Sequence, residues 1–190
     1  MSEETDPIIL VDGSSYLYRA YHALPPLMTS KNQPTGAVKG VISMIKRIRI
    51  DHPESPLAVV FDAKGKTFRH DMYSEYKGNR PPMPEDLVQQ IEPIHRIISL
   101  MGIKLIMISG VEADDVIGTL AEQARQKKLN TVISTGDKDM TQLVCDNVSV
   151  VNTMSGELLD ENGVEKKFGV GPELITDYLA LIGDKSDNVP

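Results

Sequence analysis

Short runs of apolar, mostly β-branched residues alternate along this chain with longer segments in which apolar residues recur every three or four positions. The short runs have few polar interruptions, which is typical of strands buried on both faces of a parallel sheet. We expect strands at residues 8–11, 57–61, 104–108, 131–134 and 148–151. The helical period predicts helices at residues 36–50, 85–101, 113–126 and 172–182. Pro93 is expected to kink the second of these helices or break it in two.

This alternation of strands and helices predicts an α/β fold with a mostly parallel central sheet and helices on both faces. In such sheets the ligand crevice lies beyond the carboxyl ends of the strands. Three of the expected strands place an aspartate at or just past that end, namely Asp12, Asp62 and Asp137.

Further acidic residues occupy equivalent places in the predicted fold. Glu112, Asp114 and Asp115 follow the third expected strand and open a helix, Asp139 lies two residues after Asp137, and Asp184 and Asp187 follow the last expected helix. Each acid alone is more simply explained as a helix cap or a turn residue. The nine together are harder to explain in that way, since crowded carboxylates repel one another unless cations neutralise them.

A site built only from carboxylate oxygens suits hard ions, and Mg²⁺ or Mn²⁺ is expected. Two such ions are the usual device for phosphodiester hydrolysis, in which one lowers the pKa of the attacking water and the other stabilises the leaving oxygen. The four histidines, which lie far apart in sequence, do not suggest a zinc motif.

The segment 64–80 has the composition of a surface that binds single-stranded nucleic acid. It holds five Lys or Arg against two acidic residues, and three of the chain's nine aromatic residues lie among them. Cations that contact phosphates and rings that stack on bases form such platforms. An ordinary solvated helix with a few buried rings is about as consistent with this composition. The position directly after Asp62 favours nucleic-acid binding, because it places the cations beside the acids.

Composition limits the remaining possibilities. The 190 residues suffice for one sizeable core, and the formal net charge of −7 does not exclude nucleic acid, because a third of the acids fall in the predicted metal site. Cys145 stands alone, which excludes an internal disulfide and suits a reducing compartment. No apolar run is long enough to span a bilayer and the first residues do not resemble a signal peptide, so a cytoplasmic protein without membrane contact is expected.

Two other enzyme classes fit less well. An aspartyl-phosphate phosphatase would need an acid two residues after the first strand's aspartate, where this chain has Ser14. A topoisomerase-primase-like domain could use Asp137 and Asp139, but it would need a glutamate after its first strand, where this chain has Asp12.

Six blocks in the same order resemble the 5′-nuclease domain of bacterial DNA polymerase I, in the flap endonuclease family. They cover residues 11–20, 60–69, 76–82, 110–118, 134–139 and 183–188. The resemblance implies a flap-endonuclease-like (PIN) fold with a basic helical arch at about residues 64–84. It implies a single 5′-nuclease catalytic domain over residues 1–190, without the helix–hairpin–helix that follows this point in family members.

The resemblance also assigns roles by position. Asp12, Asp62, Glu112, Asp114 and Asp115 would surround a first ion, and Asp137, Asp139, Asp184 and Asp187 a second. Lys77 and Arg80 would engage the scissile phosphate and the 5′ strand, acting in catalysis together with Asp12, Asp62, Asp114 and Asp115. Tyr76 would stack on a base. The residues expected to contact DNA are Arg19, Lys64, Lys66, Phe68, Arg69, Tyr76, Lys77 and Arg80.

The implied function is hydrolysis of phosphodiester bonds at 5′ ends and 5′ flaps of DNA, in primer removal, nick translation and repair. The flap could be RNA-primed. The chain is expected to be a monomer, associated with the bacterial nucleoid and joined to polymerase domains in a longer protein. The alternative is a DNA-binding fragment with little turnover, because without the duplex-anchoring hairpin the substrate would be misplaced.

Overall fold

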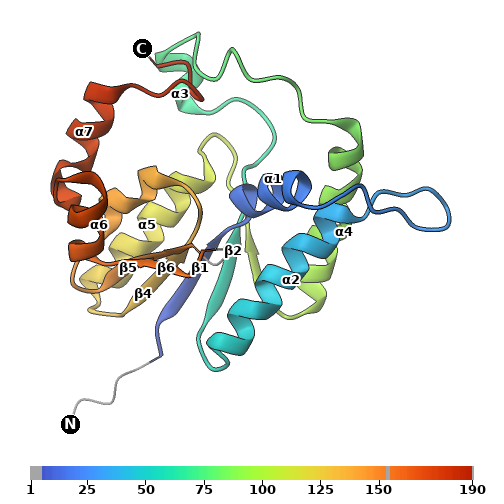
Figure 1. Cartoon of the computed structure of the whole chain (residues 1–190), viewed down its shortest axis with the longest axis horizontal. Coiled ribbons are helices and arrows are strands. Elements are labelled where there is room, and N and C mark those ends of the chain that lie inside the picture. The colour runs from blue at the N-terminus through green and yellow to red at the C-terminus, as the bar shows by residue number, and fades with distance from the viewer. Residues whose placement is uncertain (1–5, 153–154, 190) are drawn as a thin grey trace.

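A six-stranded sheet forms the centre of the molecule in the computed structural model, which describes residues 6–152 and 155–189 (Figure 1). The strand order is β3-β2-β1-β4-β5-β6; all neighbours are parallel except β5 and β6. The strands are β1 Ile8–Asp12, β2 Leu57–Val60, β3 Lys104–Ile106, β4 Thr131–Ser134, β5 Val148–Asn152 and β6 Glu157–Leu159. The expected mostly parallel sheet is confirmed.

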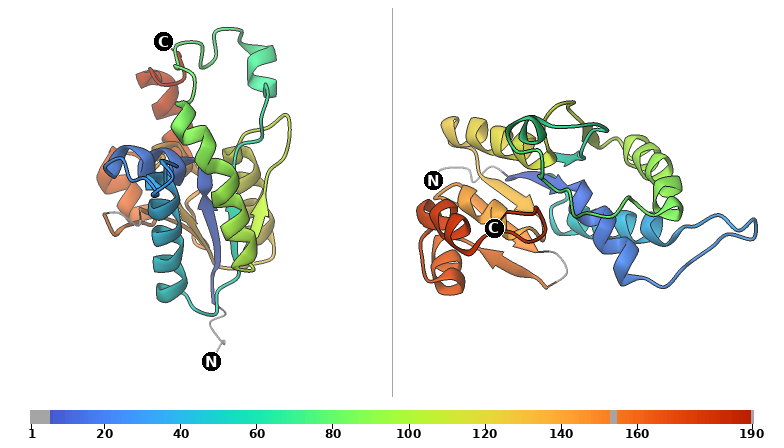
Figure 2. Two further views of the ribbon diagram at one scale, coloured as in Figure 1. Left: turned by 90° about the vertical axis from the view of Figure 1, so that its right-hand side faces the viewer. Right: turned by 90° about the horizontal axis from the view of Figure 1, so that it is seen from above.

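Helices cover both faces of the sheet, as the sequence predicted (Figures 1 and 2). Alternate side chains of one strand serve opposite cores: Ile9 and Val11 pack on one side, Leu10 on the other. The first side carries α1 Gly13–Ala23, α2 Gly36–Asp51 and α4 Glu85–Leu100. The second carries α5 Ala113–Gln126, the 3₁₀ helix η1 Lys138–Leu143, α6 Glu161–Phe168 and, after the 3₁₀ helix η2 Pro172–Leu174, α7 Ile175–Ile182.

The strand order places a topological switch point between β1 and β4. From β1 the chain builds outward to β2 and β3 on one side, and then returns to add β4 and β5 on the other. Val11 pairs with Ser134 and Asp12 with Val60, so the carboxyl ends of these strands lie level. A crevice at such a point is where open α/β sheets bind ligands.

Several local expectations were wrong. The third strand ends at Ile106 rather than residue 108, and Met107 and Ile108 are exposed. Of the two outcomes expected at Pro93, the break does not occur, because α4 runs continuously from Glu85 to Leu100, and the kink stays a prediction. Proline removes the hydrogen bond to the carbonyl four residues earlier. That residue, Gln89, is exposed, so water can satisfy its carbonyl.

Four of the described elements outside the segment 64–84 were not anticipated, namely α1, η1, β6 and α6. The expected last helix begins as η2 and becomes α-helical at Ile175.

The segment 64–84 contains one short helix, α3 Phe68–Met72, and is otherwise turn and irregular chain. It crosses above the carboxyl ends of the strands and meets the C-terminal segment there, where the Lys77 amide donates to the Asp187 carbonyl (Figure 1). Across the two described ranges, no helix has both the length and the apolar character required for crossing a bilayer.

Candidate metal and nucleic-acid site

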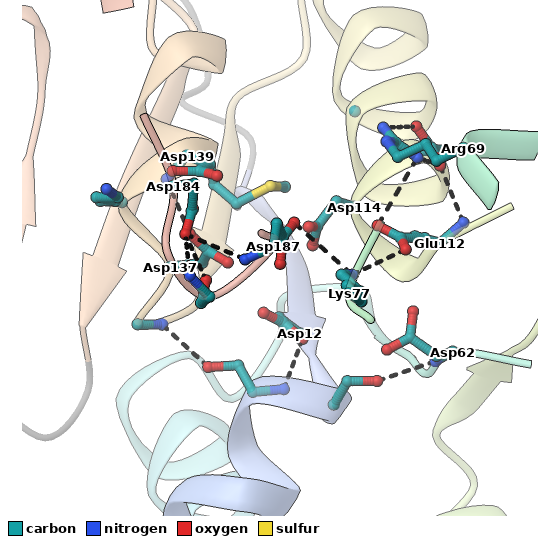
Figure 3. A pocket seen from close by; sticks show the side chains of 18 of the residues that line it. Asp12, Asp62, Arg69, Lys77, Glu112, Asp114, Asp137, Asp139, Asp184 and Asp187 are labelled. Atoms are coloured by element: carbon teal, nitrogen blue, oxygen red, sulfur yellow. Dashed lines mark hydrogen bonds and ion pairs between the residues drawn. The ribbon is translucent and has the colours of Figure 1, made fainter. Parts of the chain in front are cut away.

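A cavity of about 880 Å³ opens at the carboxyl edge of the sheet. It is lined by all nine acids selected from the sequence, which come from the ends of β1 and β2, the start of α5, the start of η1 and the segment after α7 (Figure 3). Those acids are Asp12, Asp62, Glu112, Asp114, Asp115, Asp137, Asp139, Asp184 and Asp187. Arg69, Tyr76, Lys77 and Arg80 line the same cavity.

Asp12 is buried at the end of β1, and both of its carboxylate oxygens are held by neutral donors. Oδ1 accepts from the Ser15 amide at 2.8 Å, which caps α1, and Oδ2 accepts from the Thr135 hydroxyl at 2.7 Å. Burial nevertheless raises the pKa of Asp12 to about 6, against the lowering effect of these two hydrogen bonds. The side chain is therefore fixed in place without a counter-charge.

Asp114 and Asp139 share this electrostatic condition. Burial, followed by repulsion from Asp12, raises the pKa of Asp114 to about 7. Burial and repulsion from Asp137 raise the pKa of Asp139 to about 6. Within the described residues, the buried Oδ1 of Asp139 has no hydrogen-bond partner. A buried oxygen without a donor is costly, so a cation here would relieve the cost.

Asp62 and Asp137 are placed by short hydrogen bonds to the backbone. The Ser14 hydroxyl accepts from the Asp62 amide at 2.9 Å, and Asp62 Oδ1 accepts from the Ala113 amide at 2.8 Å, at the start of α5. Asp137 Oδ1 accepts from the Asp139 amide at 2.9 Å and so caps η1. These hydrogen bonds to the starts of α5 and η1 explain why acids occur at these positions, and both acids line the cavity (Figure 3).

The acids at the start of α5 are paired with cations from the segment 64–84. Arg69 donates to both oxygens of Asp115, at 2.6 and 2.8 Å, and this pairing lowers the pKa of Asp115. Lys77 Nζ donates to Glu112 Oε1 at 2.8 Å. These two cations therefore neutralise two of the predicted ligands in this conformation.

Tyr76 and Arg80 close the same side of the cavity. The buried Tyr76 hydroxyl hydrogen-bonds Glu112 and Asp187, each at 2.9 Å, and burial raises its pKa. Arg80 pairs with Asp187. Tyr76 was expected to stack on a base; in this conformation its ring packs edge-on against His70, with Lys77 over its face, so stacking would require the segment to move. The stacking role stays a prediction.

The other residues expected to contact DNA lie around or beyond the rim. Lys64 and Lys66 are exposed, Phe68 is 43% exposed with the Arg69 guanidinium over its ring, and Arg19 donates to Asn152 Oδ1 at 2.8 Å. None of these four lines the cavity. Their roles stay predictions.

The donor set fits a hard divalent cation. It consists of carboxylates, three of which have raised pKa values, and it includes a buried oxygen without a donor. Among the described residues, however, no three metal-ligating side chains already stand close enough together to hold an ion. The division of the acids into two ion sites stays a prediction.

Sequence reasoning missed the neutral residues that hold the acids, chiefly Ser14, Ser15 and Thr135. Lys138 was missed as well; it is exposed and lines the cavity between Asp137 and Asp139. The available signal was proximity, because each of these residues lies within three positions of a selected acid. The pattern could not say which hydroxyls turn inward.

Comparisons with known proteins show the family of the chain. Residues 7–169 match the family model of the 5′-3′ exonuclease N-terminal resolvase-like domain. DNA polymerase I of Pseudomonas aeruginosa is 61% identical over 97% of this chain, and the 5′-3′ exonuclease of Aquifex aeolicus is 49% identical over 96%. The chain spans 20% of the first relative and 63% of the second.

Solved structures share the fold. The T5 D15 protein, co-crystallised with metal ions, has a TM-score of 0.75 and 24% identity, over 95% of this chain and 68% of that one. The catalytic core of Rad2, in complex with a DNA substrate, has a TM-score of 0.60 and 18% identity, over 97% of this chain and 57% of that one. With the match of the family model to most of its length, the chain belongs to the 5′-3′ exonuclease family, as an N-terminal resolvase-like domain.

Proposed function

We propose that this chain is the catalytic domain of a 5′-nuclease that hydrolyses phosphodiester bonds at 5′ ends and 5′ flaps of DNA with Mg²⁺ or Mn²⁺. The observation that carries the proposal is the meeting of nine carboxylates from distant segments in one cavity whose wall also holds Arg69, Lys77 and Arg80. Acids that bind divalent ions and cations that bind phosphates are the two components that phosphodiester hydrolysis requires.

The acids would act as the ion-binding wall. Asp12, Asp114 and Asp139 are good candidates for direct ligands, because burial and repulsion from neighbouring acids raise their pKa values, and a bound cation would relieve both. Bound ions would supply activation of a water nucleophile and neutralisation of charge on the leaving oxygen, with two ions as the expected number.

The cations would bind and orient the DNA. Lys77, Arg80 and Arg69 come from a segment that crosses the cavity, and each is now paired with an acid. A DNA phosphate would compete with the acids for these cations, and a metal ion would compete with the cations for the acids. DNA binding would thereby free acids for the metal, and metal binding would free cations for the DNA. Binding of metal and DNA is therefore expected to be cooperative.

A flap-cleavage assay tests the proposal. A 5′-labelled flap duplex is incubated with the chain in Mg²⁺, in Ca²⁺ and in EDTA, and cleavage is expected only with the catalytic ion. Asp137→Asn should remove most cleavage and leave flap binding within a few-fold. Asp160→Asn is the matched control, since Asp160 caps α6 away from the cavity and the amide oxygen can still cap. No cleavage in any metal, or full activity of Asp137→Asn, would contradict the proposal.

A DNA-binding domain with little turnover is the second candidate. It is supported by the pairing of Arg69, Lys77 and Arg80 with the acids, and by the lack of a ready-made ion site among the described residues. Metal-dependent flap binding without cleavage would favour it. Attachment to polymerase domains is proposed from the relatives named DNA polymerase I.

The remaining calls are proposals of the same kind. We propose a 5′-nuclease catalytic domain over residues 1–190, with the segment 64–84 as its arch, acting as a monomer in the bacterial cytoplasm near the nucleoid. Flaps that begin with an RNA primer belong to the proposed substrates. Cleavage of matched RNA-headed and DNA flaps would test that point directly.

A further inference from the structure

Thr135 lies at the switch point of the sheet, in a position that the proposed function does not use. It is the first residue after β4 and is 1% exposed, and it follows Ser134, which pairs across the sheet with Val11, the residue before Asp12. The Thr135 hydroxyl donates to Asp12 Oδ2 at 2.7 Å and accepts from the Asp137 backbone amide at 3.0 Å. One hydroxyl therefore joins two acids that come from strands more than a hundred residues apart.

The direction of both hydrogen bonds is fixed by chemistry. A backbone amide can only donate, so the Thr135 oxygen accepts from Asp137 and its single proton is free for Asp12. Asp12 Oδ1 is held by the Ser15 amide, so the second hydrogen bond removes the remaining freedom of the carboxylate to rotate. A second buried bridge, between the Tyr16 hydroxyl and Ser134 Oγ at 2.5 Å, fixes α1 against the same end of β4.

We infer that Thr135 is a positioning residue that holds Asp12 and the Asp137 backbone in the arrangement that binds the divalent ion. The inference rests on the proposed function, because it supposes that these two acids are ligands. A neutral hydroxyl suits this task better than a cation would. It fixes the carboxylate by a hydrogen bond without neutralising the charge that the ion needs.

The test compares Thr135→Val, which keeps the shape and removes the hydroxyl, with Thr135→Ser, which keeps the hydroxyl. Thr131→Val is the matched control: Thr131 is the first residue of β4, at its opposite end from Thr135, and is 2% exposed. Among the described residues its hydroxyl hydrogen-bonds the Leu129 carbonyl. Mn²⁺ affinity without DNA, measured by electron paramagnetic resonance, is the main readout. Thermal midpoint, and the Mg²⁺ concentration for half-maximal flap cleavage, are measured beside it.

We expect Thr135→Val to weaken Mn²⁺ binding about tenfold and to raise the half-maximal Mg²⁺ concentration by a similar factor, as loss of a group that orients a ligand does. The KM for the flap, measured at saturating Mg²⁺, should change less than twofold. Thr135→Ser should stay within about twofold of the wild type, and Thr131→Val should lower the thermal midpoint without changing Mn²⁺ affinity. Should Thr135→Val fail to fold, Thr135→Cys replaces it, with the same direction expected from its weaker donor.

Unchanged Mn²⁺ affinity in Thr135→Val, together with a loss of stability like that of Thr131→Val, would overturn the positioning role and leave the nuclease proposal intact. A tenfold loss in Thr135→Ser as well would also overturn it, because the hydroxyl would then not be what matters. A wild-type chain that binds no Mn²⁺ and cleaves no flap would overturn the proposed function and this inference together.

Discussion

The two sides of the cavity hold their acids in opposite ways. On the bare side, Asp12, Asp114, Asp137 and Asp139 form no ion pair within the described residues and are held by backbone amides, a hydroxyl and packing. On the paired side, Glu112, Asp115 and Asp187 contact Lys77, Arg69 and Arg80. The pKa of Asp114 is raised to about 7, whereas the pKa of the next residue, Asp115, is lowered.

This difference shows where in the cavity a divalent ion would bind most favourably, which the positions of the acids in the sequence do not show. The carboxylates of the bare side have no ion-pair partner among the described residues, so a divalent ion gains most there. The carboxylates of the paired side already have counter-ions, so an ion must displace a cation to bind them. The cations released in that way are the ones that the proposed function assigns to DNA.

The largest expected effect comes from Asp114→Asn on the bare side. Cleavage should fall by about 10³-fold, because a ligand of the proposed ion is lost. The thermal midpoint without metal should rise at pH 8, because the substitution removes a repelled buried charge. Asp115→Asn is the comparison: it should also lose cleavage but should lower the midpoint, since Arg69 loses a bidentate partner. Equal midpoint shifts in the two variants would remove the distinction between the sides.

The bare side should also set the pH dependence of stability in EDTA. The pKa values of Asp12, Asp114 and Asp139 are higher in the folded chain, at about 6 to 7, than the ordinary value of 3.8. Between these pKa values the folded state binds more protons than the unfolded state. The contribution of the three protonated acids to the free energy of unfolding is therefore complete below pH 4 and is lost as the pH rises to about 7.

From these groups we expect a loss of at least about 2 kcal/mol over that window, since one pKa unit is worth about 1.4 kcal/mol. Denaturant unfolding at several pH values measures it. Saturating Mg²⁺ should restore most of the loss at pH 8, and Asp114→Asn should flatten the curve. The same pH profile with and without Mg²⁺ would show that the acids do not share an ion.

On the paired side, Lys77→Met should move two properties in opposite directions. Flap cleavage should fall about tenfold through a lost phosphate contact, and the salt dependence of DNA binding should become shallower by about one unit of slope. Mn²⁺ affinity without DNA should rise a few-fold, because Glu112 loses the cation that competes with the ion. Lys46→Met, at an exposed position on α2, is the control. A fall in both properties would mean that Lys77 only stabilises the fold.

The smallest effect is expected from Arg80→Ala. The Arg80 side chain is 47% exposed, and exposed ion pairs are worth little, so the free energy of unfolding should change by less than about 1 kcal/mol. DNA affinity at low salt should still fall, with a shallower salt slope. Urea unfolding and a salt titration of flap binding measure the two quantities. A stability loss above about 2 kcal/mol would show that the Arg80–Asp187 contact holds the segment 64–84 in place.

The predicted fold came from strong local signals. Three runs are apolar enough to need burial on both faces, at residues 8–11, 57–61 and 131–134. In α2 and α5 the apolar residues recur with a clear helical period. The signal was weak for α1, which begins Gly-Ser-Ser, residues that usually mark turns. That helix forms because Asp12 caps it and because Tyr16 and Leu17 are buried against the sheet.

By itself, the sequence determined which residues carry charge and where they fall relative to strand ends, and this was enough to predict an acidic edge on a parallel sheet. Only the tertiary structure decided which acids stay unpaired and which receive a cation. That choice depends on contacts between residues far apart in the chain, such as Asp12 with Thr135 and Glu112 with Lys77. Hydrogen bonds and ion pairs act over a few ångströms, so their effect on each carboxylate is fixed only once the chain has folded.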